Sequence, residues 1–305
     1  MIWENCNPMN ATQRTLTVVI FSALTLCGLR SAEAATTIDP GNRYAYGANI
    51  GWMDWYADGA NGAVIGYYAC SGFIYSANVG WINLGSGSPT NGITYQNLSA
   101  NDFGVNNTGV TTPGYFDLRG YAYGANIGWI NFESTGGAAV NMLTGQLTGY
   151  AWSANCGWIS LDTAYAFVQT DTLYPGPLSD NGLPIPWLLT YFGTTNVNTN
   201  SDPNGTGMTV GQDYIAGTDP VQANSKLAIT SEEFAPEGTT ATLTWSSQLT
   251  RLYRIEKTTS LSPTNWVDSG LGLLVSPGSS MSETFSDSSA PDRYYRAVAV
   301  LPLYP

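Results

Sequence analysis

The sequence predicts a mostly β protein, and three observations lead to that fold class. An aromatic–Gly/Ser–Ala–Asn–x–Gly–Trp motif recurs, and its copies end at Trp52, Trp81, Trp129 and Trp158. Residues on both sides of it alternate between apolar and other side chains, which is the period of a strand. Its Asn and Gly supply turn chemistry. We expect an N-terminal array of four repeated β-hairpins, a short helical linker and a C-terminal antiparallel β-sandwich.

Each copy of the motif predicts one hairpin with a five-residue loop. The expected loops are Gly47–Gly51, Ser76–Gly80, Gly124–Gly128 and Ser153–Gly157. In that register the aromatic residue before the loop faces the Trp after it, which gives the pairs Tyr46–Trp52, Tyr75–Trp81, Tyr123–Trp129 and Trp152–Trp158. A cross-strand aromatic pair stabilises a hairpin by roughly 0.2–1 kcal/mol relative to alanine.

The two faces of each predicted hairpin differ in chemistry. One face is apolar in every copy and should form the core: Ala45, Met53 and Trp55; Ile74, Ile82 and Leu84; Ala122, Ile130 and Phe132; Ala151, Ile159 and Leu161. The other face carries the aromatic pair, a second aromatic residue (Tyr44, Phe73, Tyr121, Tyr150) and a small polar residue (Asp54, Asn83, Asn131, Ser160).

The hairpins are nested in a longer repeat. Tyr44–Leu84 aligns without gaps on Tyr121–Leu161, at a constant offset of 77 residues. The simplest account is a two-hairpin unit that was duplicated. The connecting segment, Gly85–Gly120, is rich in Gly, Asn, Ser and Thr, with strand-like patches at Ile93–Tyr95 and Tyr115–Leu118.

The first 34 residues predict a secretory signal peptide. Arg14 precedes the apolar run Leu16–Leu29, and Ala32-Glu33-Ala34 fits the small-x-small cleavage rule. The alternative is a short membrane anchor, but the run is too short to span a bilayer comfortably. We therefore expect a protein that is secreted or held at the outer cell surface. In that oxidising setting Cys70 and Cys156 form either a disulfide or two buried thiols.

The charge balance restricts the partners. The chain has 22 acidic and 10 basic residues and a net charge of −12. It therefore lacks the electrostatic footprint of a protein that binds nucleic acid or an anionic membrane. No apolar stretch after the leader is long enough to cross a bilayer. A polysaccharide or another component of the cell surface or matrix is the expected kind of partner.

A calcium-type loop is predicted in the linker. Prolines between Pro175 and Pro186 end the repeat region, and Pro186–Phe192 predicts a short helix followed by Gly193. Against the calcium-loop template, Asp202, Asn204, Thr206, the Met208 carbonyl and Asp213 take ligand positions, with Asp219 as an outer contributor. Few carboxylates imply weak binding, near 10⁻⁴–10⁻³ M. A metal-free helix–turn–helix spacer is the alternative.

Leu178–Asp219 resembles the thrombospondin type 3 and dockerin-like calcium repeats of bacterial exported proteins, in which an aromatic-rich helix leads into an acidic loop and an AGTDP tail. The copy is degenerate, because Asn204 and Thr206 stand where aspartate is usual and Asp213 replaces a bidentate glutamate. The resemblance implies extracellular calcium binding by Asp202, Asn204, Thr206, Met208 and Asp213.

The C-terminal region predicts a small antiparallel sandwich. Ala241–Trp245, Leu252–Ile255, Asn265–Asp268, Met281–Phe285 and Arg293–Val298 alternate as strands do, with Gly, Pro and Ser between them. Trp245 and the late Tyr294-Tyr295 resemble the fibronectin type III and immunoglobulin-like pattern. The expected domains are thus a signal peptide (1–34), a hairpin repeat domain (35–172), a linker with the degenerate loop (173–224) and a sandwich (225–305).

Residue types argue against an enzyme. The chain has no histidine, which excludes Ser-His-Asp and Cys-His arrangements and histidine zinc sites. Two carboxylates suffice for a glycosidase, but the repeats share no acid, since Asp54 is matched by Asn131 and Glu133 by Tyr56. We expect no catalytic residues.

The repeated side chains leave two interpretations open. The repeated Asn is expected to shape the turn and cap backbone groups rather than bind a ligand. The repeated Trp either packs hairpins together or forms an open aromatic platform that holds sugar rings. On the second interpretation the ligand-binding set is Trp52, Trp81, Trp129, Trp158, Tyr44, Tyr121, Tyr150, Asn83 and Asn131.

Together the modules resemble those of bacterial secreted or surface proteins that bind rather than react. The first hypothesis is therefore a non-catalytic binding or adhesion protein that takes glycans on its aromatic face. The alternatives are an extracellular structural or self-assembling subunit and an accessory module of polysaccharide degradation.

Overall fold

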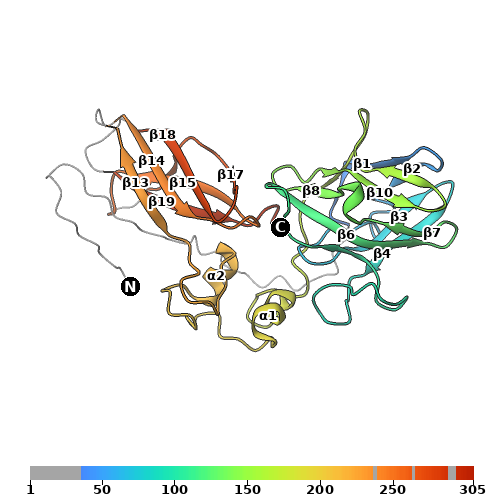
Figure 1. Ribbon diagram of the computed structural model, residues 1–305, viewed down its shortest axis with the longest axis horizontal. Coiled ribbons are helices and arrows are strands. Elements are labelled where there is room, and N and C mark those ends of the chain that lie inside the picture. Colours follow the sequence, from blue (N-terminus) through green and yellow to red (C-terminus); the bar gives the residue numbers. More distant parts are fainter. Residues whose placement is uncertain (1–35, 236–238, 263–264, 288–292) are drawn as a thin grey trace. The chain divides into compact units, whose positions relative to one another are not determined.

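The computed structural model describes residues 36–235, 239–262, 265–287 and 293–305, so the predicted signal peptide lies outside the described residues. The protein is mostly β, with antiparallel sheets and short helices. Its described part divides into two compact units (Figure 1). The repeat unit contains residues 36–199 and Pro302–Pro305, and the C-terminal unit is Asn200–Leu301.

The motif copies form hairpins, as predicted from their turn chemistry. These are β1 (Ile38–Gly47) with β2 (Gly51–Asp54), β3 (Ser71–Ser76) with β4 (Gly80–Ser86), β6 (Tyr115–Gly124) with β7 (Gly128–Asn131), and β10 (Tyr150–Ser153) with β11 (Gly157–Ser160). The expected cross-strand pairs are confirmed, because Tyr46 faces Trp52 and the other copies follow the same register. The predicted loop length was wrong. Gly47 pairs with Gly51, so the turn itself holds only residues 48–50.

The four hairpins close into a barrel, which the prediction of a hairpin array did not foresee. Within residues 36–199, all of which the structure describes, β2 pairs with β3, β4 with β6, β7 with β10, and β11 with β1. Eight strands thus follow one another around the barrel in chain order, and no edge is left open between them. Closure also removes the unpaired backbone edge that an open array would present to other chains.

Shorter strands extend the barrel beyond the hairpins. β5 (Val105–Asn107) and β8 (Ala139–Asn141) pair with the first half of β6, β9 (Leu147–Thr148) pairs with β8, and β12 (Val168–Thr170) pairs with β1. The predicted patch at residues 115–118 belongs to β6, whereas residues 93–95 form no strand. The Tyr95 side chain is instead buried, and its hydroxyl donates to the Cys70 carbonyl.

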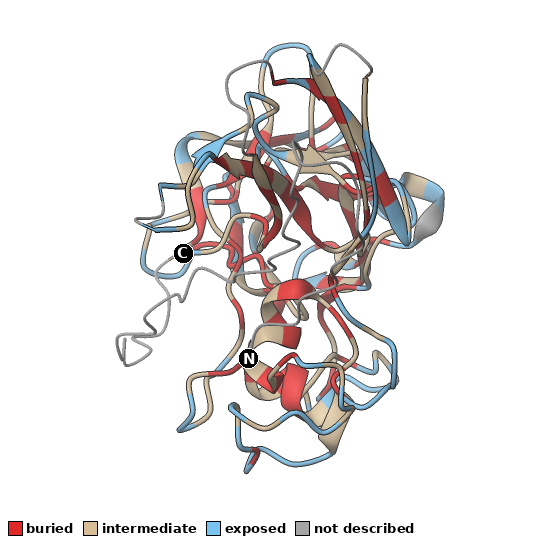
Figure 2. Ribbon diagram, turned by 90° about the vertical axis from the view of Figure 1, so that its left-hand side faces the viewer, coloured by how far each residue is buried: buried red, intermediate tan, exposed pale blue. Residues whose placement is uncertain are grey.

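The predicted core face lines the inside of the barrel. All of its members are buried: Ala45, Met53, Trp55, Ile74, Ile82, Leu84, Ala122, Ile130, Phe132, Ala151, Ile159 and Leu161. Figure 2 shows buried and exposed segments alternating along the strands. A barrel of this strand number has an interior just wide enough for side chains to fill. Small alanines on one strand and large residues on its partner satisfy that limit, as at Ala45 and Met53.

A ring of side-chain hydrogen bonds joins the hairpin loops, and we call it the asparagine ring. The Nδ2 of Asn49 donates to the Cys156 carbonyl, Asn78 to Ile50, Asn126 to Val79, and Asn155 to Ile127, at 3.0–3.1 Å. Each asparagine therefore caps the loop of the preceding hairpin, and Asn49 returns to the last one. The expectation that Asn caps backbone groups is confirmed, but the group belongs to a neighbouring loop.

Residues inside the asparagine ring are matched in size. Ile50, Val79, Ile127 and Cys156 are buried at this end of the barrel. A Cβ at Gly47 would lie 2.8 Å from the Ile50 side chain, and one at Gly124 would lie 2.9 Å from that of Ile127. The other two copies place the larger Ser76 and Ser153 beside the smaller Val79 and Cys156. The loops with Gly and Ile and the loops with Ser and Val or Cys therefore fill a similar volume at this end of the barrel.

The linker residues divide between the two units. Helix α1 (Ile185–Phe192) belongs to the repeat unit and ends at Gly193 with φ 65°, as predicted. The calcium-type loop and helix α2 (Val210–Ala216) belong to the C-terminal unit. There Met208 and Ala216 share a buried cluster with Trp245, and Arg251 donates to the carbonyls of Tyr214 and Ile215 at the end of α2.

The C-terminal unit holds two antiparallel sheets around that cluster. One contains β13 (Ile229–Phe234), β14 (Thr240–Ser246) and β18 (Ser280–Ser286); the other contains β15 (Leu252–Thr258), β16 (Val267–Asp268), β17 (Leu274–Val275) and β19 (Tyr294–Val300). The predicted strands fall on β14, β15, β18 and β19. The one expected at residues 265–268 is reduced to β16, and β13 was not foreseen.

We predict that Asn126→Ala destabilises the repeat unit by about 1 kcal/mol, because it removes one hydrogen bond of the asparagine ring without opening a cavity. Urea denaturation followed by tryptophan fluorescence measures the change. The neighbouring Ala125→Ser is the control, since substitutions at exposed loop positions change stability by at most about 0.5 kcal/mol. An equal effect of both variants would show that the ring adds no stability.

Candidate functional site

The outer face of the barrel carries tilted rows of aromatic side chains, which we call the aromatic rows. Following the pairing from strand to strand, each row reads Trp, Tyr or Trp, a polar residue, and a second aromatic residue. The rows are Trp81–Tyr75–Asp54–Tyr44, Trp129–Tyr123–Asn83–Phe73, Trp158–Trp152–Asn131–Tyr121 and Trp52–Tyr46–Ser160–Tyr150. Each row spans two neighbouring hairpins. The predicted ligand-binding residues are therefore brought together in rows, but the rows point outward around a closed barrel.

The repeated Trp side chains lie at the surface. Trp52, Trp81, Trp129 and Trp158 are 45–49% exposed, so the open-face interpretation fits better than hairpin packing. Of the second aromatic residues, Tyr44 and Tyr121 are only partly exposed, whereas Tyr150 is 48% exposed, much like the Trp side chains.

Neighbouring aromatic rings hold one another in place. In the first hairpin the Tyr46 and Trp52 rings lie 4.9 Å apart, and the Tyr44 ring meets Trp52 edge-on at 6.3 Å. The second and third hairpins repeat this arrangement. Such contacts add about 0.5–1.5 kcal/mol per pair beyond burial. The rows are therefore ordered surfaces rather than loose side chains.

Three of the polar residues end their strands, and the fourth, Asn83, lies within β4. The Asn83 Oδ1 accepts from the Gly85 N–H at 2.8 Å, and the Asn131 Oδ1 accepts from the Glu133 N–H at 2.5 Å. Their Nδ2 groups remain without a hydrogen-bond partner among the described residues. Asn83 and Asn131 thus keep one donor each for a ligand, whereas Asp54 is engaged by Arg43 at 3.0 Å.

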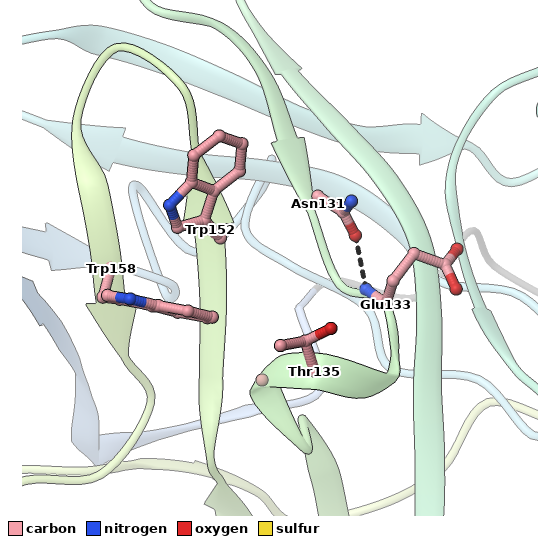
Figure 3. A pocket seen from close by; sticks show the side chains of 6 residues that line it. Asn131, Glu133, Thr135, Trp152 and Trp158 are labelled. Carbon is pink, nitrogen blue, oxygen red and sulfur yellow. Dashed lines mark hydrogen bonds between the residues drawn. The ribbon is translucent and has the colours of Figure 1, made fainter.

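One row borders a hollow of about 240 Å³, which Figure 3 shows from close by. It is lined by Asn131, Glu133, Thr135, Gly136, Trp152 and Trp158. The Trp152 and Trp158 rings stand apart on β10 and β11, and Asn131, Glu133 and Thr135 lie across the hollow from them. The 3-10 turn η1 (Ser134–Gly136) forms that opposite side. We call this space the hollow.

Close approach of η1 to β10 shapes the hollow. A Cβ at Gly136 would lie 1.9 Å from the Tyr150 carbonyl oxygen and 3.4 Å from Trp158 Cζ3, so only glycine fits there. Sequence reasoning missed Glu133, Thr135, Gly136 and Trp152 as site residues. One signal was present, because Trp152 replaces the Tyr that the other copies carry at this position.

The calcium-type loop brings its predicted residues into one region. The Asp202 carboxylate accepts from the backbone N–H groups of Thr206 and Gly207, at 3.1 and 2.9 Å, and Asn204 Oδ1 accepts from the Thr206 hydroxyl. The Met208 side chain points into the core, where its sulfur accepts from the Leu227 N–H. No cluster of three or more metal-binding acids, cysteines or histidines occurs among the described residues.

Asp213 is the exceptional residue of this loop. Its side chain is fully buried; one carboxylate oxygen accepts from the Thr218 hydroxyl at 2.5 Å, and the other has no partner among the described residues. Burial is the main cause that raises the pKa of Asp213 from 3.8 to about 6; the hydrogen bond from Thr218 opposes this shift, and the charges of Asp202 and Asp219 contribute to it. One oxygen of this buried carboxylate is thus left without a partner among the described residues, and metal binding at this loop stays a prediction.

Cysteine chemistry adds no reactive group. Cys70 and Cys156 are free thiols and both are buried. Burial raises the pKa of Cys70 to about 12, which suppresses the nucleophilic thiolate.

Comparisons with protein-family models, with curated proteins and with solved structures give no match for this chain. Among the described residues, no helix has the length and apolar character needed to cross a membrane.

We predict that, without metal, the C-terminal unit loses stability as the pH rises from about 4 to about 6. Folding raises the pKa of Asp213, so the folded state binds the proton more tightly and is favoured below this window. Hydrogen exchange of β14 at several pH values in chelator measures the effect. Asp213→Asn should remove this part of the pH dependence, and an unchanged profile in the variant would contradict the assignment.

Proposed function

We propose that this chain is an exported, non-catalytic binding protein that attaches to glycans through the outer face of its barrel. One observation carries the proposal: the repeated Trp side chains are nearly half exposed and ordered by neighbouring rings. Ring contacts on the packed side of each indole stabilise the hairpins, but the exposed half of each indole adds nothing to stability, so such an exposed set indicates a binding surface.

The chemistry of the aromatic rows supports a carbohydrate ligand. A sugar ring presents a C–H face that packs on an aromatic ring and hydroxyl groups that bond to polar side chains at its edge. The rows place the free amides of Asn83 and Asn131 beside such rings. The chain's net charge of −12 disfavours nucleic acid and anionic membranes.

Two other roles compete with this proposal. A self-assembling structural subunit would use the same exposed aromatic residues against other copies of the chain, but barrel closure removes the strand edges through which sheets usually associate. An accessory module of polysaccharide degradation would bind the same ligands as we propose, and it differs only in having an enzyme as its partner.

We predict that the protein is retarded in affinity electrophoresis through gels that contain neutral polysaccharide. Alanine replacement of Trp52, Trp81, Trp129 or Trp158, one at a time, should leave the barrel folded. The cost should be roughly 1–2 kcal/mol, below the 3–5 kcal/mol of a fully buried site, because about half of each side chain is exposed. At least one variant should lose retardation, and Trp266→Ala in the C-terminal unit is the control. Retardation that survives every barrel variant would contradict this use of the aromatic face.

A second proposal concerns calcium at the loop of the C-terminal unit. We propose that Asp202, Asn204, Thr206, the Met208 carbonyl and Asp213 hold the ion weakly, with Asp219 nearby. The buried, unpartnered oxygen of Asp213 favours this role over a metal-free spacer. Because Met208 and Ala216 lie in the core of the same unit, a bound cation would stabilise that unit directly.

We expect calorimetric titration with calcium to show binding near 10⁻⁴–10⁻³ M, as for loops with few carboxylates. Asp202→Ala should abolish the heat, whereas Asp180→Ala, outside the loop, should leave it unchanged. Absence of both heat and a shift in Tm at saturating calcium would leave only the spacer role.

A further inference from the structure

The duplication supplies an internal comparison for the hollow. At the offset of 77 residues, Trp158 corresponds to Trp81, Trp152 to Tyr75, and Glu133 to Tyr56. Each row therefore has a partner of the same origin in the other half of the barrel, and differences between them show which row is free to bind.

The corresponding positions in the first half carry larger side chains that contact one another. The Tyr56 ring lies so near Gly59 that a Cβ there would be 3.0 Å from it, and the Arg43 guanidinium sits 5.3 Å from the Tyr56 ring centre. Arg43 also pairs with Asp54, which removes that polar group from use. In the second half Glu133 replaces Tyr56 and Gly120 replaces Arg43, so both obstructions are absent and the hollow results.

The two remaining rows differ from the row beside the hollow. The Phe103 ring stands 5.0 Å from Trp129 and 6.3 Å from Tyr123, so it packs against the row that contains Asn83. In the row of Trp52, the polar member is Ser160, whose hydroxyl donates to the Asp162 carbonyl. Among the four rows, only the one beside the hollow combines two exposed indoles with a free amide.

The lining of the hollow selects an uncharged ligand. Trp152 and Trp158 offer apolar faces, and the Asn131 amide and the Thr135 hydroxyl offer hydrogen bonds, whereas the Glu133 carboxylate at the border extends away from the two indoles. No basic side chain lines it, so a uronic acid or a sulfated sugar would meet Glu133 without compensation. About 240 Å³ gives room for one sugar ring rather than a folded oligosaccharide.

We propose that the hollow is a single binding site for one uncharged hexopyranose unit of a neutral glycan. Trp158 packs on the ring and the Asn131 Nδ2 donates to a hydroxyl, while Glu133 at the border adds a negative charge that disfavours anionic sugars. The other aromatic rows order the barrel surface and do not bind. This inference rests on the proposed glycan-binding function and restricts it to one row and one class of sugar.

The test is calorimetric titration of the full-length protein with the hexasaccharides cellohexaose, laminarihexaose and mannohexaose, and with hexagalacturonate as the acidic probe. We expect at least one neutral hexasaccharide to bind with one site per chain, and the acidic probe to bind at least tenfold more weakly. Trp158→Ala and Glu133→Tyr, which introduces the residue of the first half, should each weaken binding at least tenfold. The matched control, Trp81→Ala, should change the affinity less than twofold.

The outcomes separate the two proposals. Several equivalent sites per chain, or equal losses in Trp158→Ala and Trp81→Ala, would overturn the single-site inference and leave glycan binding intact. Tighter binding of hexagalacturonate than of the neutral hexasaccharides would overturn the inference that the ligand is uncharged. Binding to none of the probes, with no retardation by neutral polysaccharide, would overturn the proposed function itself. Circular dichroism of each variant shows whether a loss of binding reflects unfolding.

Discussion

The asparagine ring is the constraint on which the rest of the repeat unit depends. A hairpin alone is marginal in water, and four hairpins in a row still leave two unpaired edges. Each Asn amide joins its own loop to the loop before it, and the bond from Asn49 to Cys156 connects the first hairpin to the last. The ring therefore fixes both the spacing of the loops and the closure of the sheet. Glycine after each loop makes this possible, since φ is 72–78° at Gly51, Gly80, Gly128 and Gly157.

Closure decides where the aromatic residues go. The interior of an eight-stranded barrel is just wide enough for side chains to fill, and the buried core face of the strands already fills it. The second face of every strand must then face outward, whatever its composition. Aromatic pairs at this surface stabilise the hairpins through ring contacts while leaving about half of each indole in water. The same aromatic residues can therefore stabilise the hairpins and bind a ligand. At Trp152 and Trp158 the rings stand apart, which leaves room for a ligand beside them.

The sequence was sufficient for the local structure and insufficient for the assembly. Alternation and turn chemistry predicted the hairpins, their register and the core face of each hairpin, all of whose residues are buried, because these depend on near neighbours. Barrel closure depends on pairs such as Asn83 with Tyr123, which are distant in sequence and carry no local signal. The loop compositions did indicate that the loops pack against one another. Gly47 occurs with the larger Ile50 and Ser76 with the smaller Val79, so the summed side-chain size stays similar. The hollow was missed for a similar reason, because η1 reaches Trp158 only through the fold.

Duplication explains how one barrel supports both an ordered frame and a separate site. The asparagines of the ring are the same in both halves, and the cross-strand pairs stay aromatic. Positions just after the second strand of a hairpin lie outside the ring and are free to differ. There the first half places Tyr56 near Gly59 and beside Arg43. The second half places Glu133 and Thr135 at matching positions, and η1 holds Gly136 against β10. The same frame therefore carries a filled row and an open one, and the difference lies in residues that closure does not need.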